Sequence, residues 1–224
     1  MKIASTYISA IVAILLLAAC GFNTSYVRLT TEESDKIKKL AVIVEGNPEF
    51  SYIDESTKLN LGAAYVFGLL GYLAAHSADE AHDNEVAKSI TPLEIELSGR
   101  NQLINNIVTD LENTNRYNIV KIFESTALIP KKNEFDAVAI FNINAWGARI
   151  HQGGTGKLID FIDVSVKLKR FEDDKIIWND KQVITIETRH SIEEYRNNNE
   201  LVRKDMDEVI FKSAQRMTNM LVNP

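Results

Sequence analysis

The chain has 224 residues, of which 25 are lysine or arginine and 31 are aspartate or glutamate, so its formal net charge at pH 7 is −6. This acidic balance argues against a protein that binds nucleic acid or anionic lipid headgroups through bulk charge. A single cysteine excludes an internal disulfide, so the fold must be held together by core packing, for which about 200 residues suffice.

The first twenty residues have the order of a secretory signal. Lys2 gives a short positive region, residues 8–17 form an apolar run, and two alanines precede Cys20. The run is about ten residues long, whereas a membrane-spanning helix needs about twenty. We therefore expect residues 1–19 to be removed by a signal peptidase.

Residues 17–20, Leu-Ala-Ala-Cys, resemble the lipobox of bacterial lipoproteins. The resemblance implies that Cys20 is the first mature residue and carries a thioether-linked diacylglycerol and an N-acyl chain, which would hold the protein at a lipid bilayer. Gly21 stands where inner-membrane lipoproteins carry aspartate, so the resemblance favours the periplasmic face of the outer membrane over retention in the inner membrane. The alternative is a buried cysteine inside an ordinary cleaved signal.

The next stretch, residues 20–38, is polar and charged and shows no apolar periodicity. We expect it to be an acylated tether that leads to one periplasmic domain, residues 39–224. Residues 39–44 are compact and rich in β-branched side chains, and a turn follows them, so they predict a buried strand. Phe50, Tyr52 and Ile53 predict a short extended piece.

An apolar segment studded with small residues occupies positions 59–75. Gly62, Gly68 and Gly71 would each cost a helix about 1 kcal/mol relative to alanine. Close packing against another backbone would offset that cost. The segment is either a buried helix or a surface for self-association or membrane insertion, and its seventeen residues are marginal for spanning a bilayer.

Leu103, Ile104, Ile107, Val108 and Leu111 follow a helical period, so residues 101–113 predict an amphipathic helix. The stretch 92–98 stays open between helix and strand, because it combines a capping-box pattern with alternating apolar residues. Residues 117–123 predict a second strand. The long crossover between the two strands predicts that they lie parallel in one sheet.

Three further strands are expected at 135–150, 159–171 and 175–188, with an acidic turn between the last two, which together form an antiparallel meander. Apolar residues between 201 and 221 recur on a helical period. The pattern predicts an α+β fold, a two-layer sandwich in which helices cover one face of a mixed sheet of about five strands.

The sequence around the meander resembles a small periplasmic α/β module. The resemblance rests on residues 136–140, on Trp146 and Gly147, on 162–168 and on 175–178. The module occurs in envelope lipoproteins related to the curli secretion subunit, in the amino-terminal domain of the Tol-system propeller protein and in lipoprotein activators of penicillin-binding proteins. The resemblance implies a scaffold for assembly, and it transfers no functional residue to a named position here.

A glycine-rich loop at 153–157, Gly-Gly-Thr-Gly-Lys, invites comparison with a phosphate-binding loop. The comparison fails, because Leu158 follows where serine or threonine would hold magnesium, and because a strand is expected where a helix should begin. We expect a hairpin loop in which Gly153, Gly154 and Gly156 accept positive φ and contact a partner.

The sequence offers residues for two other kinds of chemical site, a zinc site and a catalytic site. His76, Asp79, Glu80, His82 and Asp83 cluster closely enough to suggest zinc, but a solvated acidic helix end explains them better. No serine or cysteine shows a paired histidine base, so no catalytic residue is assigned. Trp146 and Trp178 are expected to be aromatic residues of the core or of the sheet surface rather than a sugar-binding platform.

These features together predict a non-enzymatic binding or assembly factor of the envelope, which acts in secretion, cell-wall synthesis or envelope maintenance and has no cofactor and no bound metal. Its expected partners are the bilayer, through Cys20, and a periplasmic or outer-membrane protein, which could be a second copy of this chain; nucleic acid is not expected. The alternative is an oligomeric pore or secretion-complex subunit that uses segment 59–75. The expected contact residues are Gly62, Gly68, Gly71, Gly153, Gly154 and Gly156.

Overall fold

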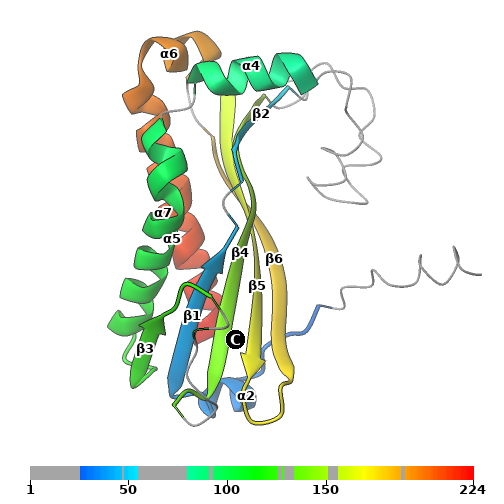
Figure 1. Cartoon of the computed structure of the whole chain (residues 1–224), viewed down its shortest axis with the longest axis vertical. Helices are drawn as coiled ribbons and strands as arrows, with labels where there is room; N and C mark the ends of the chain where they lie inside the picture. Colours follow the sequence, from blue (N-terminus) through cyan, green and yellow to red (C-terminus); the bar gives the residue numbers. More distant parts are fainter. Residues whose placement is uncertain are drawn as a thin grey trace, which may run out of the picture.

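The computed structural model describes residues 26–46, 48–54, 80–90, 93–125, 128, 134–150, 156–187 and 190–224. The signal sequence, Cys20 and segment 59–75 lie outside the described residues, so the predictions made for them are not addressed by the fold. The described residues form an α+β structure that confirms the expected class, with one sheet and a layer of helices (Figure 1).

The sheet has six strands in the order β3-β1-β4-β5-β6, with β2 beside β4. Their bounds are β1 Lys39–Glu45, β2 Phe50–Asp54, β3 Ile119–Ile122, β4 Ala137–Ile150, β5 Leu158–Arg170 and β6 Ile176–Glu187. β1 runs parallel to β3 and to β4, while β4, β5 and β6 form an antiparallel meander. The predicted crossover and meander are therefore confirmed, and β2, expected only as an extended piece, supplies one strand more than the expected five.

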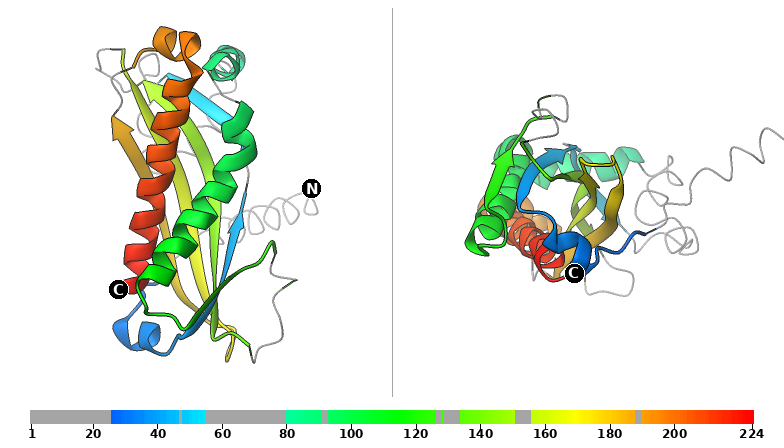
Figure 2. Two further views of the ribbon diagram at one scale, coloured as in Figure 1. Left: turned by 90° about the vertical axis from the view of Figure 1, so that its left-hand side faces the viewer. Right: turned by 90° about the horizontal axis from the view of Figure 1, so that it is seen from below.

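Five helices are described: α2 Thr31–Asp35, α4 Glu80–Ile90, α5 Leu93–Asn113, α6 Ile192–Asn197 and α7 Asn199–Val222. The stretch 92–98, left open by the sequence, begins α5 at Leu93. α5 and α7 lie on one face of the sheet, while α4 and α6 lie at one end of it and α2 at the other (Figures 1 and 2). The sandwich with helices on one face is thus confirmed.

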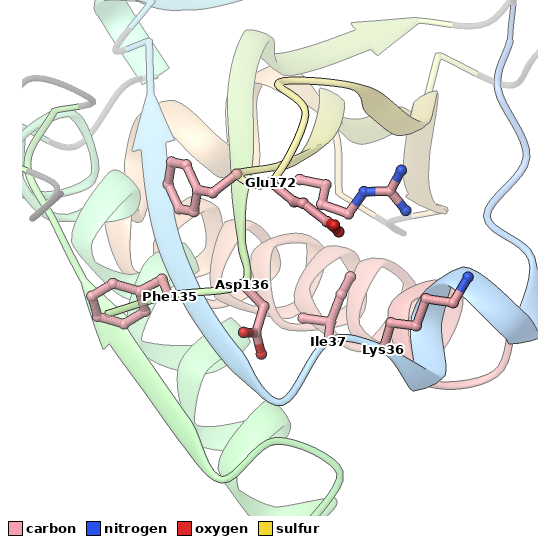
Figure 3. Close-up of a pocket in the computed structure, with 7 residues that line it drawn as sticks. Lys36, Ile37, Phe135, Asp136 and Glu172 are labelled. Atoms are coloured by element: carbon pink, nitrogen blue, oxygen red, sulfur yellow. The ribbon is translucent and has the colours of Figure 1, made fainter. Parts of the chain in front are cut away.

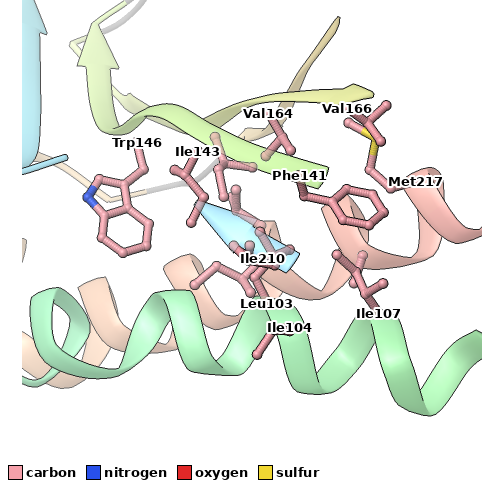
Figure 4. Close-up of a cluster of buried hydrophobic side chains, with 14 of the residues drawn as sticks. Leu103, Ile104, Ile107, Phe141, Ile143, Trp146, Val164, Val166, Ile210 and Met217 are labelled. Atoms are coloured by element: carbon pink, nitrogen blue, oxygen red, sulfur yellow. The ribbon is translucent and has the colours of Figure 1, made fainter. Parts of the chain in front are cut away.

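The main core lies between the sheet and the pair α5 and α7 (Figure 4). Leu103 and Ile107 of α5 and Met217 of α7 are fully buried against Phe141 of β4 and Val166 of β5. Buried positions recur every three or four residues along the helices and every second residue along the strands. This is the periodicity from which the sequence predicted these helices and strands.

Trp146 and Trp178 are both buried in this core, which is one of the two placements that the sequence predicted. The ladder between β4 and β5 is irregular between Ile143 and Ala145. Because one extra residue reverses the alternation of side chains, Ile143 and Trp146 both face the helices, although three positions separate them.

The opposite face of the sheet is covered by no helix among the described elements. It carries two small apolar clusters, one formed by Ile53, Ala145 and Phe161 and the other by Ala41, Ile43, Phe135 and Val138. Gly147 lies on this side, where β2 approaches β4 so closely that a Cβ there would stand 1.8 Å from the carbonyl oxygen of Ser51. Only glycine allows β2 to pair at this register, since its φ is +153°.

Candidate functional site

The segment before β1 packs onto the domain from Val27 onward. Val27 pairs with Asn179 of β6, whose backbone N–H donates to the Val27 carbonyl at 2.9 Å. Leu29 and Ile37 are buried, and Thr30 caps α2 by accepting from the backbone N–H of Glu33 at 3.2 Å. The prediction of a tether through residue 38 is therefore wrong for 27–38. Leu29 and Ile37 are eight residues apart and belong to no repeating apolar pattern, so no sequence pattern indicated that they are buried.

The last residues of α7 also lie beside α2. The hydroxyl of Ser34 donates to the carbonyl of Leu221 at 3.3 Å. The guanidinium of Arg116 donates to the Val222 carbonyl at 2.9 Å, to Ser34 Oγ at 2.8 Å and to Asp35 at 2.9 Å. The start of the domain, its last helix and the turn before β3 are thus tied together in one cluster.

Arg170, at the end of β5, joins α2 to the β5–β6 turn. Its guanidinium forms ion pairs with Glu33 and with Asp173, the latter at 2.7 Å. The hydrogen bonds from Arg170 hold the pKa of Asp173 well below its ordinary value, at about 2. The same bonds raise the pKa of Arg170 above its already high value. The segment 31–35 is therefore fixed by charge as well as by its buried side chains.

A pocket of about 390 Å³ opens beside this junction (Figure 3). Ile37 and Phe135 give it a buried apolar floor, and Asp136 ties its wall to β1 by accepting from the backbone N–H groups of Lys38 and Lys39 at 2.7 and 2.8 Å. Its lining residues are Lys36, Ile37, Phe135, Asp136, Arg170, Phe171 and Glu172. The two cations of the lining, Lys36 and Arg170, balance its two anions, Asp136 and Glu172.

A second hollow, of about 560 Å³, runs between α5 and α7. All of its lining side chains are polar: Ser98, Asn101, Gln102, Asn105, Asn106, Arg203 and Asp207. The amide of Gln102 donates to Asp207 at 3.0 Å and so links the two helices. Asparagine and glutamine amides both donate and accept hydrogen bonds, so the groove offers donors and acceptors side by side.

Of the six glycines predicted to contact a partner, only Gly156 lies among the described residues. It has a φ of +72°, and a Cβ there would meet nothing within 4 Å, so it stands in open space before β5. Gly62, Gly68, Gly71, Gly153 and Gly154 lie outside the described residues, as does Cys20. The prediction that these six glycines contact a partner is therefore not tested by the described residues.

Only some of the residues for which a metal site, catalysis or a membrane span was considered are described by the structure. Within the described ranges no three His, Cys, Asp or Glu side chains are placed to hold a metal ion. His76 and Asp79 fall outside those ranges, and His190 is the one histidine whose side chain is described. Searched over the same ranges, no helix combines the length and the apolar character that crossing a membrane requires.

Comparisons with known proteins leave the family open. No family model matches the chain, and no curated protein matches it. The resemblance to envelope assembly modules therefore stays a prediction.

The solved structures that resemble this fold include bacterial lipoproteins. A minor lipoprotein from Acinetobacter baumannii matches with a TM-score of 0.38 and 12% identity, over 59% of this chain and 89% of that one. A Xanthomonas campestris protein described by the family model DUF330 matches with a TM-score of 0.47 and 9% identity, over 88% and 86%. A Helicobacter pylori protein described as a homologue of a neuraminyllactose-binding hemagglutinin matches with 0.41 and 13%, over 88% and 89%. These values are too low to carry a functional argument.

Proposed function

We propose that this chain is a lipid-anchored envelope protein that faces the periplasm and acts as a non-enzymatic binding or assembly factor. One observation carries the proposal: the only cysteine stands directly after a signal-like segment and a few residues before the point where the folded domain begins. An exported protein with acyl chains on Cys20 would be held permanently at a bilayer. Gly21 favours the outer membrane as that bilayer.

The short linker would orient the domain. Seven residue steps lead from Cys20 to Val27, so an extended linker reaches about 25 Å and a flexible one averages about 15 Å. α7 has 24 residues and is therefore about 36 Å long. The end with α2 and the 390 Å³ pocket would face the lipid, and the end with α4 and α6 would point away from it (Figure 1).

The surfaces of the domain that do not face the lipid would be available to a protein partner. Removing residues 1–19 removes Lys2 and no other charged residue, so the mature chain changes from −6 to −7. This charge disfavours adhesion of the domain to anionic headgroups, which leaves the acyl chains as the lipid contact. The amide-lined groove between α5 and α7 supports a polar protein partner rather than an apolar one.

Metabolic labelling with radioactive palmitate tests the anchor. The wild-type chain should take up label and sediment with membranes, whereas Cys20→Ala should do neither. A wild-type chain that stays unlabelled while it is exported would refute lipid anchoring.

Photo-cross-linking in cells tests the binding role separately. A benzoylphenylalanine at Asn105, in the polar groove, should attach to a discrete envelope protein, and one at Glu172, beside the 390 Å³ pocket, should not give the same product. If neither position nor Gly156 yields an attached protein in correctly lipidated cells, the assembly role is wrong although the anchor stands. The pore alternative rests on segment 59–75, and no described residue favours it.

A further inference from the structure

Three acidic or phenolic side chains from three elements meet at the end of the fold that carries α6. Asp160 of β5 and Tyr195 of α6 are both fully buried, and the Tyr195 hydroxyl lies 2.7 Å from Asp160 Oδ2 and 2.5 Å from Asp205 Oδ2 of α7. His190, just before α6, places Nε2 3.9 Å from the same Asp205 oxygen. None of these residues lines the two pockets described above.

The number of protons in this cluster is fixed by geometry. A tyrosine hydroxyl has one hydrogen and can donate it to only one carboxylate. The second short contact is a hydrogen bond only if the other carboxyl group carries its own proton and donates to the tyrosine oxygen. One of the two aspartates is therefore protonated when both contacts are made.

Asp160 is the one that carries the proton. Its pKa is raised to about 8, chiefly by burial and also by the negative charge of Asp205, although the hydrogen bond between Asp160 and Tyr195 acts to lower it. Its other oxygen, Oδ1, is buried and has no hydrogen-bond partner among the described residues, so the charge of an ionised Asp160 would be poorly compensated there. Asp205 is partly exposed, with 13% of its side chain accessible, and lies near His190, so it is the better site for the charge.

Among the described residues that pair with Asp160 across the sheet or hydrogen-bond to it, none is a cation that could replace this proton. Its strand neighbours are Ala148 on β4 and Ile186 on β6, both apolar. α6 presents Tyr195 and α7 presents Asp205. His190, which can become positive, places its Nε2 3.9 Å from Asp205 Oδ2.

We propose that the hydrogen-bonded residues Asp160, Tyr195 and Asp205 form a proton-dependent clasp, which holds α6 against the sheet and against α7. Loss of the Asp160 proton at alkaline pH releases α6. In the closed state Asp160 donates to the Tyr195 oxygen, and Tyr195 donates to the Asp205 carboxylate. In the ionised state two carboxylates compete for one hydrogen. α6 also holds α4, because Arg196 Nε donates to Ser89 Oγ at 2.9 Å, so its release would loosen the whole end that points away from the anchor.

The direction of the pH effect follows from the proton count. In the unfolded chain Asp160 loses its proton near pH 4, whereas in the folded protein it keeps the proton up to about pH 8. The stabilisation is fully present below pH 4 and is lost progressively as pH rises through 8. Asp160→Asn keeps a neutral side chain of the same shape, so its melting temperature should change less between pH 6 and pH 9 than that of the wild type.

A carbon-13 titration of the aspartate carboxyl groups tests the clasp directly in the non-acylated chain from residue 21. The resonance assigned to Asp160 by its absence in Asp160→Asn should titrate near pH 8, with about one molecule in a hundred ionised at pH 6 and about nine in ten at pH 9. Asp205→Asn should lower that midpoint, because it removes the neighbouring charge and frees Tyr195 to donate to Asp160. A midpoint near 4 in the wild type, or one that Asp205→Asn leaves unchanged, would overturn the proposal.

Hydrogen exchange supplies the local readout. After correction for the intrinsic pH dependence, the amides of α6 should lose protection between pH 6 and pH 9 relative to those in the middle of α7, and this loss should be absent in Asp160→Asn. Glu208→Gln, which changes an exposed acidic residue of α7 outside the cluster, should behave as wild type. Equal loss of protection in α6 and α7 would show general alkaline unfolding and would contradict a clasp.

Discussion

At the scale of single residues, the close contact between Gly99 and Trp146 explains a glycine in the interior of a long helix. A Cβ on Gly99 would stand 2.6 and 2.8 Å from two atoms of the indole ring, which is fully buried. The ring is rigid and enclosed, so it cannot move aside as a flexible side chain could. The glycine is therefore the condition for packing α5 onto β4.

Gly99→Ala should destabilise the protein by about 2 kcal/mol, because overpacking against a rigid ring lies at the upper end of a range of about 1–3 kcal/mol and the gain in helix propensity returns about 1 kcal/mol. Urea denaturation measures the change in the free energy of unfolding. Asn105→Ala, on the exposed side of the same helix, is the matched control and should be neutral or slightly stabilising. Equal stability of Gly99→Ala and wild type would show that the contact with the ring is looser than described.

The Arg170–Asp173 pair makes a prediction about acid stability. The pKa of Asp173 is lowered to about 2, so its carboxylate stabilises the fold above pH 4, and this contribution is lost as pH falls through 2. Arg170→Gln should return the Asp173 midpoint toward the ordinary value of 3.8 in a carboxyl carbon-13 titration. It should also lower the melting temperature at neutral pH.

Arg203→Gln provides the control for that measurement, since it breaks an exposed pair with Glu200 and should change the melting temperature little. An Asp173 midpoint that stays near 2 in Arg170→Gln would mean that the backbone N–H of Lys175, 3.3 Å away, holds the carboxylate instead.

At the scale of elements, the segment before β1 behaves as part of the domain. α2 has only five residues and would not persist alone, because short helices in water are marginal. It is held by the burial of Leu29 and Ile37 on either side of it and by Arg170 and Arg116. The proposed linker to the lipid would consequently be much shorter than the polar composition of 20–38 suggests.

Leu29→Ala should cost about 2–4 kcal/mol, the range for removing a buried leucine. Tyr26→Ala, three residues earlier, should cost almost nothing, since Tyr26 is 71% exposed whereas Leu29 is 2% exposed. Thermal and urea unfolding of the two variants locate the boundary between linker and domain. Similar stabilities for both variants would place that boundary after Leu29.

At the scale of the whole molecule, the proposed anchor and the short linker give the elongated domain two unlike ends. The end with α2 and both termini of the described chain would lie near lipid, and the end with α4, α6 and the Asp160 clasp would lie away from it (Figures 1 and 2). A partner in the periplasm would then meet the second end first.

Fluorescence quenching tests this orientation. Because Cys20 is the only cysteine and would be acylated, Glu172→Cys and Glu193→Cys can each be labelled at a single site in lipidated protein. A quencher in the headgroup region of vesicles should reduce the fluorescence at 172 more than at 193. Equal quenching would show that the domain lies flat on the membrane or tumbles freely.

The sequence by itself determined the elements whose signal is local. The strands at 39–44 and 135–188, the helix at 101–113 and the carboxyl-terminal helix each repeat a pattern within about ten to twenty residues, so periodicity revealed them together with the α+β class. The signal-like segment and Cys20 are equally local, although their role is proposed. What only the tertiary structure decided are contacts between distant positions.

Arg170 meets Glu33 across 137 positions, Arg116 meets Ser34 across 82, and Tyr195 meets Asp160 across 35. Nothing in a short window marks these residues, because a charged or phenolic side chain looks the same in sequence whether it is solvated or buried. The start of α5 at Leu93 and the packing of residues 27–38 onto the domain also depend on distant parts of the chain. In both cases, burial against a surface that remote strands build overrides a weak local preference. The junction around α2 and Arg170 at one end of the fold, and the contacts of the proposed clasp at the other, therefore form only when the chain is folded.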